Sequence, residues 1–294
     1  MIAELAVQAG AELGEAPVWG AEPGTLHWLD LLTGDLHSWR PGASIERKVM
    51  VDAPTPLGGI VRSTAAGELL LAHAGGLSTL DIEDGRTHPI ADPIGRLPNL
   101  VFNDIKTDRS GRLWLGTADV TEADHRGILY RQGGCGPRAL GFDVADAGFA
   151  VCNGPAFSAD GATLFLSDSA EGRVLSYELD EMGIATGRRT FVQLADDEGL
   201  PDGITVDTEG GLWVAHWNGA AVSRFDCGGR LTERIAVPTP LVTSMTFGGD
   251  DLRTLFITTA GGAGTPGGAD EAGSLFTAHP GVTGIAEVPW GVAP

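Results

Sequence analysis

The sequence contains few cysteines and no long apolar stretch. Its three cysteines, Cys135, Cys152 and Cys227, form no Cys-x-x-Cys pair, and an odd number in a chain of 294 residues gives no disulfide framework. No run approaches the roughly 18–20 apolar residues of a membrane span, and the N-terminus carries an acidic residue where a secretory signal needs basic ones. We therefore expect a cytoplasmic protein in a reducing compartment.

Basic residues are also scarce. The chain has 19 Lys and Arg against 39 Asp and Glu, which gives a net charge of −20. A charge of this sign repels the phosphate backbone of nucleic acids and the anionic surface of membranes. We therefore expect no nucleic-acid or membrane partner, and nothing in the sequence indicates an obligate protein partner.

Two sequence motifs of hydrolases are missing. There is no G-x-S-x-G nucleophile elbow and no H-E-x-x-H, which excludes the serine hydrolase and zincin classes in their motif forms. One match to the dinucleotide fingerprint G-x-G-x-x-G occurs at residues 262–267. The motif requires a following helix, whereas Pro266 and further glycines come next, so we interpret this segment as a loop.

What the sequence does contain is a repeat. Hydrophobic residues make up 43% of the chain, enough for a sizeable core, and 44 glycines and 17 prolines indicate many tight turns. Six segments share a short apolar run, a turn rich in Gly and Asp, and a second apolar run that often contains Trp or Phe. The residue before each first run is at position 15, 57, 103, 153, 202 and 243, a period of 41–50 residues.

This period, with short strands and no useful helical periodicity, is typical of four-stranded β-propeller blades. The sequence predicts an all-β fold, a six-bladed β-propeller with four-stranded antiparallel blades, as a single domain over residues 1–294. Polar tetrads ending in Gly at residues 108–111, 158–161 and 207–210 are predicted to be turns, because EF-hand ligands are absent around them. Residues 2–7 and 285–289 are the candidate strands for closing the ring.

Equivalent positions of the innermost strands should point to one mouth of the central channel. Those positions hold Glu15, Leu57, Asn103, Asn153, Asp202 and Thr243. Two carboxylates and two carboxamides form the ligand set of a hard cation, most simply Ca²⁺, with Mg²⁺, Mn²⁺ or Fe²⁺ as alternatives, and Zn²⁺ is less favoured because no His or Cys is present. The competing interpretation is that Asn and Asp only cap turns there, but Glu15 is a poor turn former.

The motifs around these positions resemble the SMP-30/gluconolactonase family, also called the regucalcin family, of six-bladed propeller lactonases. The resemblance extends over essentially the whole chain. It is carried by LGEAPVW at residues 13–19, FND at 102–104 with GRLWLGT at 111–117, NG at 153–154 with DS at 168–169, PDG at 201–203 with GGLWVA at 210–215, and FGG at 247–249.

The resemblance implies a role for each matching residue. Glu15, Asn153 and Asp202 would bind one divalent metal, Asp202 would also carry a proton as the catalytic residue, and Asn103 would contact substrate. The implied reaction is metal-dependent hydrolysis of a sugar-acid (aldono-) lactone to the free acid, so the expected partner is a small-molecule sugar lactone. Two alternatives stay open: a non-catalytic propeller that binds a metal or a partner, and a hydrolase of a non-sugar lactone or a phosphoester.

The chain departs from the family pattern at one substrate position. Regucalcin-type members carry an Arg two residues before the Asn, where this chain has Val101, and the loop of residues 119–126 is shorter here. Val cannot donate a hydrogen bond to a substrate hydroxyl. We therefore expect a lactone preference different from that of gluconolactone-directed relatives, with Asn103 and this loop, a candidate lid, supplying the remaining polar contacts.

Overall fold

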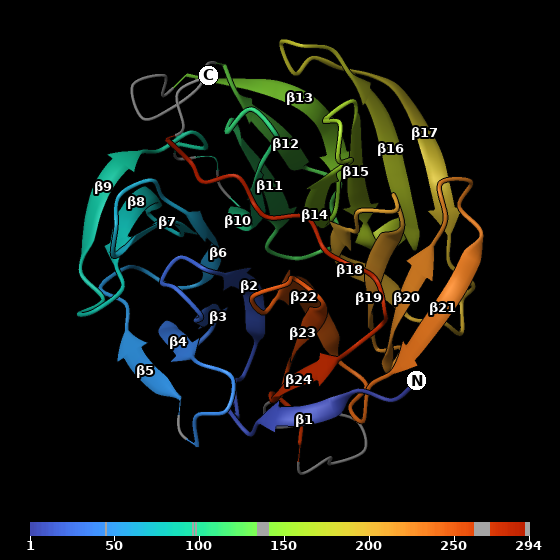
Figure 1. Ribbon diagram of the computed structural model, residues 1–294. Coiled ribbons are helices and arrows are strands. Elements are labelled where there is room, and N and C mark those ends of the chain that lie inside the picture. Colours follow the sequence, from blue (N-terminus) through green and yellow to red (C-terminus); the bar gives the residue numbers. More distant parts are fainter. Residues whose placement is uncertain (45, 96, 98, 134–140, 262–270, 292–294) are drawn as a thin grey trace.

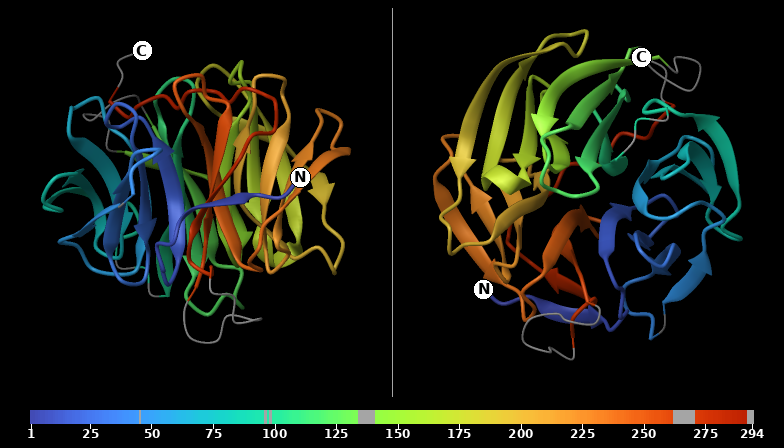
Figure 2. Two further views of the ribbon diagram at one scale, coloured as in Figure 1. Left: turned by 60° about the horizontal axis from the view of Figure 1, so that its bottom comes forward. Right: turned by 180° about the vertical axis from the view of Figure 1, so that it is seen from behind.

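All strands in the described part of the chain belong to six four-stranded antiparallel sheets arranged in a ring (Figure 1). The computed structural model describes residues 1–294 except 45, 96, 98, 134–140, 262–270 and 292–294. Figure 2 shows the same ring from the side and from behind. The prediction of a six-bladed β-propeller with four-stranded antiparallel blades is confirmed.

Each blade runs from the central channel outward, and five of the six follow chain order. The first blade is β2(Gly14–Trp19), β3(Leu26–Asp30), β4(Asp35–Trp39) and β5(Arg47–Met50). The second is β6(Leu57–Arg62), β7(Glu68–His73), β8(Gly76–Asp81) and β9(Thr87–Ala91). The third is β10(Leu100–Thr107), β11(Leu113–Asp119), β12(Gly127–Gln132) and β13(Phe142–Phe149).

The fourth blade is β14(Cys152–Phe157), β15(Thr163–Asp168), β16(Arg173–Leu179) and β17(Ala185–Gln193). The fifth is β18(Leu200–Val206), β19(Leu212–Trp217), β20(Ala221–Phe225) and β21(Leu231–Ala236). The sixth contains β22(Val242–Gly248), β23(Thr254–Thr259) and β24(Leu275–Ala278). Within the described ranges the single helical element is the 3₁₀ turn η1(Ser169–Glu171), and no helix there is long and apolar enough to span a membrane.

The N-terminal strand β1(Glu4–Val7) closes the ring. It pairs antiparallel with β24 and forms the outermost strand of the sixth blade. This confirms one of the two strands expected at the chain ends. The other expectation was wrong: residues 285–289 form no strand, because β1 already occupies the outer edge of that blade.

Residues 285–289 instead cross the far mouth of the channel, in front of the innermost strands in Figure 1. Arg62 donates to the Glu287 carbonyl, Thr107 donates to the Val288 carbonyl, and the Lys106 ammonium pairs with the Glu287 carboxylate. Arg62, Lys106 and Thr107 lie at the ends of β6 and β10. The segment therefore covers the channel at the ends of the innermost strands, opposite their beginnings.

Two of the predicted turns anchor buried tryptophans. The Asp207 carboxylate accepts hydrogen bonds from the Gly211 backbone N–H (2.8 Å) and from Trp213 Nε1 (2.8 Å), and Asp108 makes the equivalent contact to Trp114 Nε1 (3.2 Å). Both tryptophans are fully buried. The tetrads therefore act as turns that also satisfy the polar atom of a large core residue.

The apolar cores lie between neighbouring blades. One cluster joins Val18 and Leu29 of the first blade to Ile60 and Leu71 of the second, and another joins the fifth blade to the sixth. Side chains on the two faces of each blade thus pack against the blades on either side. This packing holds the six innermost strands around the channel with their first residues at one mouth.

Candidate functional site

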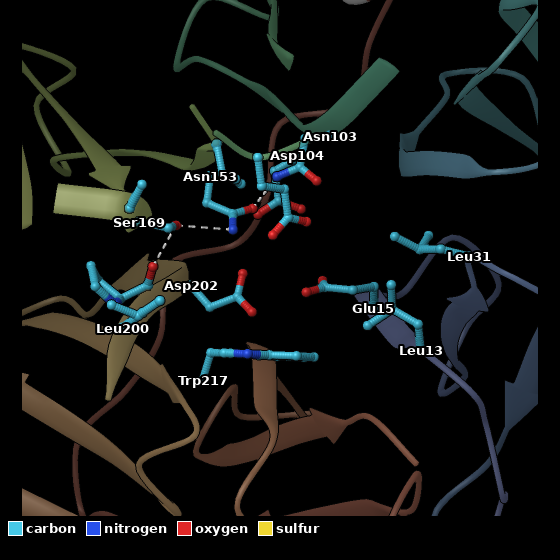
Figure 3. A pocket seen from close by; sticks show the side chains of 14 residues that line it. Leu13, Glu15, Leu31, Asn103, Asp104, Asn153, Ser169, Leu200, Asp202 and Trp217 are labelled. Carbon is cyan, nitrogen blue, oxygen red and sulfur yellow. Dashed lines mark hydrogen bonds between the residues drawn. The ribbon is translucent and has the colours of Figure 1, made fainter. Parts of the chain in front are cut away.

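A cavity of about 280 Å³ lies at the mouth where the innermost strands begin. Its size is near the lower end of the range of small-ligand sites. Glu15, Asn103, Asn153 and Asp202 all line it, from four different blades (Figure 3). Residues up to 187 positions apart in the sequence thus meet at one place. The structure brings together every residue proposed from the sequence, and their chemical roles stay predictions.

The two other ring positions do not reach the cavity. Leu57 packs into the apolar cluster between the first and second blades. The Thr243 hydroxyl donates to the Gly14 carbonyl (2.5 Å) and is fully buried. Only four of the six equivalent positions therefore face the cavity. At the other two, Leu57 and Thr243 contact neighbouring blades instead.

A local irregularity recurs at this end of every innermost strand. The pairing register shifts just after the mouth in β2, β6, β10, β14, β18 and β22. An extra residue in a strand bends it and re-aims the neighbouring side chains. Ala16 and Gly154, which follow Glu15 and Asn153, have φ of 50° and 27°, in the left-handed region. The bulges therefore turn the site residues toward the channel axis.

Four carboxylates line this cavity, and three of them, those of Glu15, Asp104 and Asp202, are buried, whereas Glu122 is exposed. Glu15, Asp104 and Asp202 are only 6%, 9% and 7% exposed. Burial is the main cause that raises the pKa of each, and proximity to Asp104 raises the pKa of Glu15 and of Asp202 further. Figure 3 shows the carboxylates of Glu15 and Asp202 facing each other across the cavity. The cluster is therefore a buried acidic site that a bound cation would stabilise.

The donor set fits a hard divalent cation. No Lys, Arg or His is among the residues that line the cavity, and Lys106, the cation that lowers the pKa of Glu15 and Asp104, lies deeper in the channel. Within the described ranges, no three His, Cys, Asp or Glu side chains by themselves form a metal-binding group. A site built from Glu15 and Asp202 therefore relies on the Asn153 carbonyl oxygen as well, which suits Ca²⁺ better than Zn²⁺.

Asp104 is a site residue that sequence reasoning did not single out. Its Oδ2 accepts a hydrogen bond from the Gly154 backbone N–H (2.8 Å), so it fixes the bulge that follows Asn153. It lines both the mouth cavity and a smaller cavity of about 10 Å³ in the channel below. In the sequence its one distinguishing feature is its place directly after Asn103, and the register shift of β10 at this point is visible in the structure.

A second group of cavity residues comes from the ends of the second strands. Gly14, Cys152 and Pro201, each just before a site residue, pair with Asp30, Asp168 and His216. The residues that follow these partners, Leu31, Ser169 and Trp217, all line the cavity. The same repeat phasing that indicated the first ring would have found this one.

The walls of the cavity differ in character. Leu13, Leu31, Val151, Leu200 and Trp217 provide apolar surface, and the ring of Trp217 lies beside Glu15 and Asp202 in Figure 3. A flat aromatic surface next to carboxylates suits a ligand with one apolar face and several hydroxyl groups. The site can therefore hold a small polyhydroxylated ring against a cation.

The candidate lid loop contributes one residue. Glu122 lines the cavity, and residues 120–126 are exposed. Val101 is half-buried on β10, pairs with Ala118 and is not among the residues that line the cavity. The structure therefore gives no direct contact between position 101 and the cavity, and the expected effect of Val101 on lactone preference stays a prediction. The G-x-G-x-x-G segment at residues 262–267 and Cys135 lie outside the described residues.

Comparisons with known proteins agree with this geometry. The family model described as SMP-30/Gluconolactonase/LRE-like region matches residues 13–261. The chain is 32% identical to pentonolactonase XacC of Haloferax volcanii, over 96% of this chain and 95% of that protein. It is 33% identical to regucalcin of Xenopus laevis, over 87% and 86% of the two chains.

A solved structure matches the whole ring. The structure described as a calcium-binding protein, regucalcin, from Agrobacterium tumefaciens str. C58 superimposes with a TM-score of 0.88 at 25% identity, covering 99% of this chain and 97% of that chain. The similarity includes all six blades and therefore the mouth that carries the cavity.

Proposed function

The chain belongs to the SMP-30/gluconolactonase/LRE-like family, and from this membership and the geometry of the cavity we propose that it hydrolyses a sugar-acid (aldono-) lactone to the free acid with one divalent cation, Ca²⁺ in the first place. The observation that carries the proposal is that Glu15, Asn153 and Asp202 meet in one buried acidic cavity with an apolar wall. The relative named pentonolactonase and the calcium-binding regucalcin structure support the substrate class and the cation.

Glu15, Asn153 and Asp202 would hold the cation through two carboxylates and one amide carbonyl. A bound divalent cation supplies a Lewis acid that polarises the lactone carbonyl. Mn²⁺, Fe²⁺, Mg²⁺ and Zn²⁺ are the alternatives, because oxygen ligands accept all of them with different affinity.

Asp202 would accept the proton of the attacking water and later return it. Next to a cation its carboxyl stays ionised at neutral pH, so it accepts a proton from the attacking water as the bond between water oxygen and carbonyl carbon forms. It then returns the proton to the ring oxygen as the bond between acyl carbon and ring oxygen breaks. The product is the open hydroxy acid, and Asp202 is again a carboxylate.

Asn103 and Trp217 would orient the sugar. Both hydrogens of the Asn103 amide nitrogen are donated, to the Cys152 carbonyl (3.2 Å) and to Asn153 Oδ1, so Asn103 offers its carbonyl oxygen to a substrate hydroxyl. The Trp217 ring and Leu200 would contact the C–H face of the lactone. These contacts involve parts of the substrate that do not react, so they set the orientation of the carbonyl.

The test is a substrate and metal panel. EDTA-treated protein is assayed for acid release from pentono-1,4-lactones and D-glucono-1,5-lactone, with Ca²⁺, Mg²⁺, Mn²⁺, Fe²⁺ or Zn²⁺, beside a non-sugar lactone and a phosphoester. We expect metal-dependent turnover of at least one aldonolactone. Calcium binding in calorimetry without turnover of any lactone would indicate a non-catalytic propeller, and turnover confined to the phosphoester or the non-sugar lactone would replace the substrate class.

A further inference from the structure

A continuous chain of hydrogen bonds runs behind the site residues. The Ser169 hydroxyl donates to the Pro201 backbone carbonyl (2.6 Å), and Asn153 Nδ2 donates to the same Ser169 oxygen (3.2 Å). Asn153 Oδ1 in turn accepts from Asn103 Nδ2. Figure 3 shows Ser169 on the side of Asn153 away from Glu15.

The Ser169 hydroxyl determines which groups donate and which accept along this series of hydrogen bonds. A hydroxyl has one hydrogen, and a backbone carbonyl can only accept, so the Ser169 hydrogen is committed to Pro201. Toward Asn153 the Ser169 oxygen can therefore only accept, and Asn153 must present its NH₂ group to it. The Asn153 carbonyl oxygen is then forced to the opposite side.

The orientation of Asn153 in turn determines the orientation of the Asn103 amide. Because Asn153 Oδ1 accepts there, Asn103 must present its own NH₂ group, whose second hydrogen is donated to the Cys152 carbonyl (3.2 Å). Asn103 Oδ1 is left as the acceptor at the end of the chain. We propose that Ser169 is a positioning residue whose single hydroxyl fixes the orientation of both carboxamides, so that their oxygens serve the cation and a substrate hydroxyl.

Because Ser169 and Asn153 are buried, only the Ser169 hydroxyl can fix the Asn153 amide in this way. Ser169 and Asn153 are 6% and 8% exposed, so water has little access to take the place of the hydroxyl. The two ends of an amide are nearly equal in size, so without the hydroxyl the Asn153 side chain can rotate by 180° with no steric penalty. A rotated Asn153 would direct N–H groups at the cation and at Asn103. The inference rests on the proposed function, which makes the cavity a cation site. Its test measures cation binding directly.

The test compares four single variants and one double variant by calorimetric titration of the EDTA-treated protein with Ca²⁺. Ser169→Ala should raise the Kd for Ca²⁺ about tenfold, which is about 1.4 kcal/mol. Ser169→Thr, which keeps the hydroxyl, should stay within about twofold of wild type. Ser167→Ala is the matched control, because the Ser167 hydroxyl donates to the neighbouring Asp202 carbonyl (2.7 Å) and bonds to no side-chain amide in the described structure. It should lower thermal stability and leave the Kd within about twofold.

The fourth variant separates positioning from general damage. Asn153→Asp replaces the amide with a carboxylate, which has no distinct ends, so adding Ser169→Ala to it should change the Kd less than about twofold. If Ser169→Ala does not fold by circular dichroism, Ser169→Cys replaces it, since a thiol of similar shape is a weak acceptor and should also raise the Kd.

Three results overturn the proposal: a folded Ser169→Ala with wild-type Ca²⁺ affinity, an equal loss in Ser167→Ala, or an equal loss of affinity in the Asn153→Asp background. The first would leave the lactonase proposal intact. A wild type that binds Ca²⁺ and responds to Ser169→Ala but hydrolyses no lactone would support the positioning role and refute the proposed reaction. A wild type that binds none of Ca²⁺, Mg²⁺, Mn²⁺, Fe²⁺ and Zn²⁺ would overturn both.

Discussion

Replacing Glu15 with Gln should make the metal-free protein more stable at pH 8 and strongly weaken its stabilisation by Ca²⁺. Glu15 is 6% exposed, and burial, reinforced by Asp104 and Asp202, raises its pKa well above the ordinary value of 4.5. Gln keeps the shape of Glu and removes the charge. A residue that binds a cation thus stabilises the loaded protein and destabilises the empty one.

The sign of the pH dependence follows from the raised pKa. The folded protein holds the Glu15 proton more tightly than the unfolded chain does, so wild type loses stability as the pH rises from 4.5 through the folded pKa. Gln has no proton to lose. The advantage of the variant without metal should therefore vanish near pH 4.5 and grow toward pH 8.

The size of the effect can be bounded. Leaving one buried polar group without a partner costs about 1–3 kcal/mol, and a charged group costs more. Each kcal/mol changes the Tm of a chain of this size by about 2–4 °C, so a cost of about 1–3 kcal/mol predicts that metal-free Glu15→Gln melts about 2–12 °C above metal-free wild type at pH 8. Free Ca²⁺ at one hundred times the wild-type Kd should stabilise wild type by about 2.7 kcal/mol and stabilise the variant far less, because a neutral amide is a weaker ligand than a carboxylate.

Thermal unfolding followed by circular dichroism, in EDTA and in Ca²⁺ at pH 5, 6.5 and 8, measures all of these quantities. Glu12→Gln is the matched control, because it removes the same charge from an exposed residue nearby and should change neither the metal-free Tm nor the Ca²⁺ response. The reasoning is refuted if metal-free Glu15→Gln melts below wild type at pH 8, or if Ca²⁺ raises its Tm as much as that of wild type.

Three further outcomes follow from other residues. Asp202→Asn should lose activity about 10²-fold or more, and saturating Ca²⁺ should not restore it, because an amide can bind the cation but cannot accept a proton; full rescue in steady-state assays would leave Asp202 a ligand only. Burial lowers the pKa of His27 from 6.5 to about 4, so the unfolded chain takes up the proton first and wild type should lose up to about 3 kcal/mol between pH 6.5 and 4; urea unfolding of His27→Asn should show a flatter pH profile over that range. Asp207→Ala should cost about 3–5 kcal/mol, because it removes the buried partner of Arg224, which keeps the exposed Glu209 as its remaining carboxylate, and removes the acceptor of Trp213 Nε1; a urea midpoint within error of wild type would contradict this.

The fold could be predicted because the sequence pattern of one blade recurs in the others, so each repeat supports the assignment of the rest. The positions of Glu15, Asn103, Asn153 and Asp202 follow from repeat phasing alone, since equivalent residues of a ring converge on its axis. The phasing could not show that Leu57 and Thr243 turn away, because that depends on packing between neighbouring blades. It also could not show that β1 rather than residues 285–289 closes the ring, since both segments read as short strands.

The hydrogen-bond partners of the site lay beyond the reach of sequence reasoning. Ser169 and Asp104 touch Asn153 and Gly154 through contacts between blades or across a bulge, and no spacing in the sequence encodes which polar atom meets which. Trp217 looks like the other strand tryptophans in the sequence, and only its place after His216, equivalent to that of Ser169 after Asp168, distinguishes it. A pattern predicts which residues share a ring, and only coordinates show which atoms are donors.

The pairing of β1 with β24 has a consequence for synthesis of the chain. Residues 4–7 leave the ribosome long before their partner strand at residues 275–278. The first five blades can form as their strands appear, whereas the sixth must wait until β24 has been made. Until then the edge of the nascent sheet has no partner and can pair with other chains. A chain truncated before residue 275 would therefore be an open ring prone to aggregation.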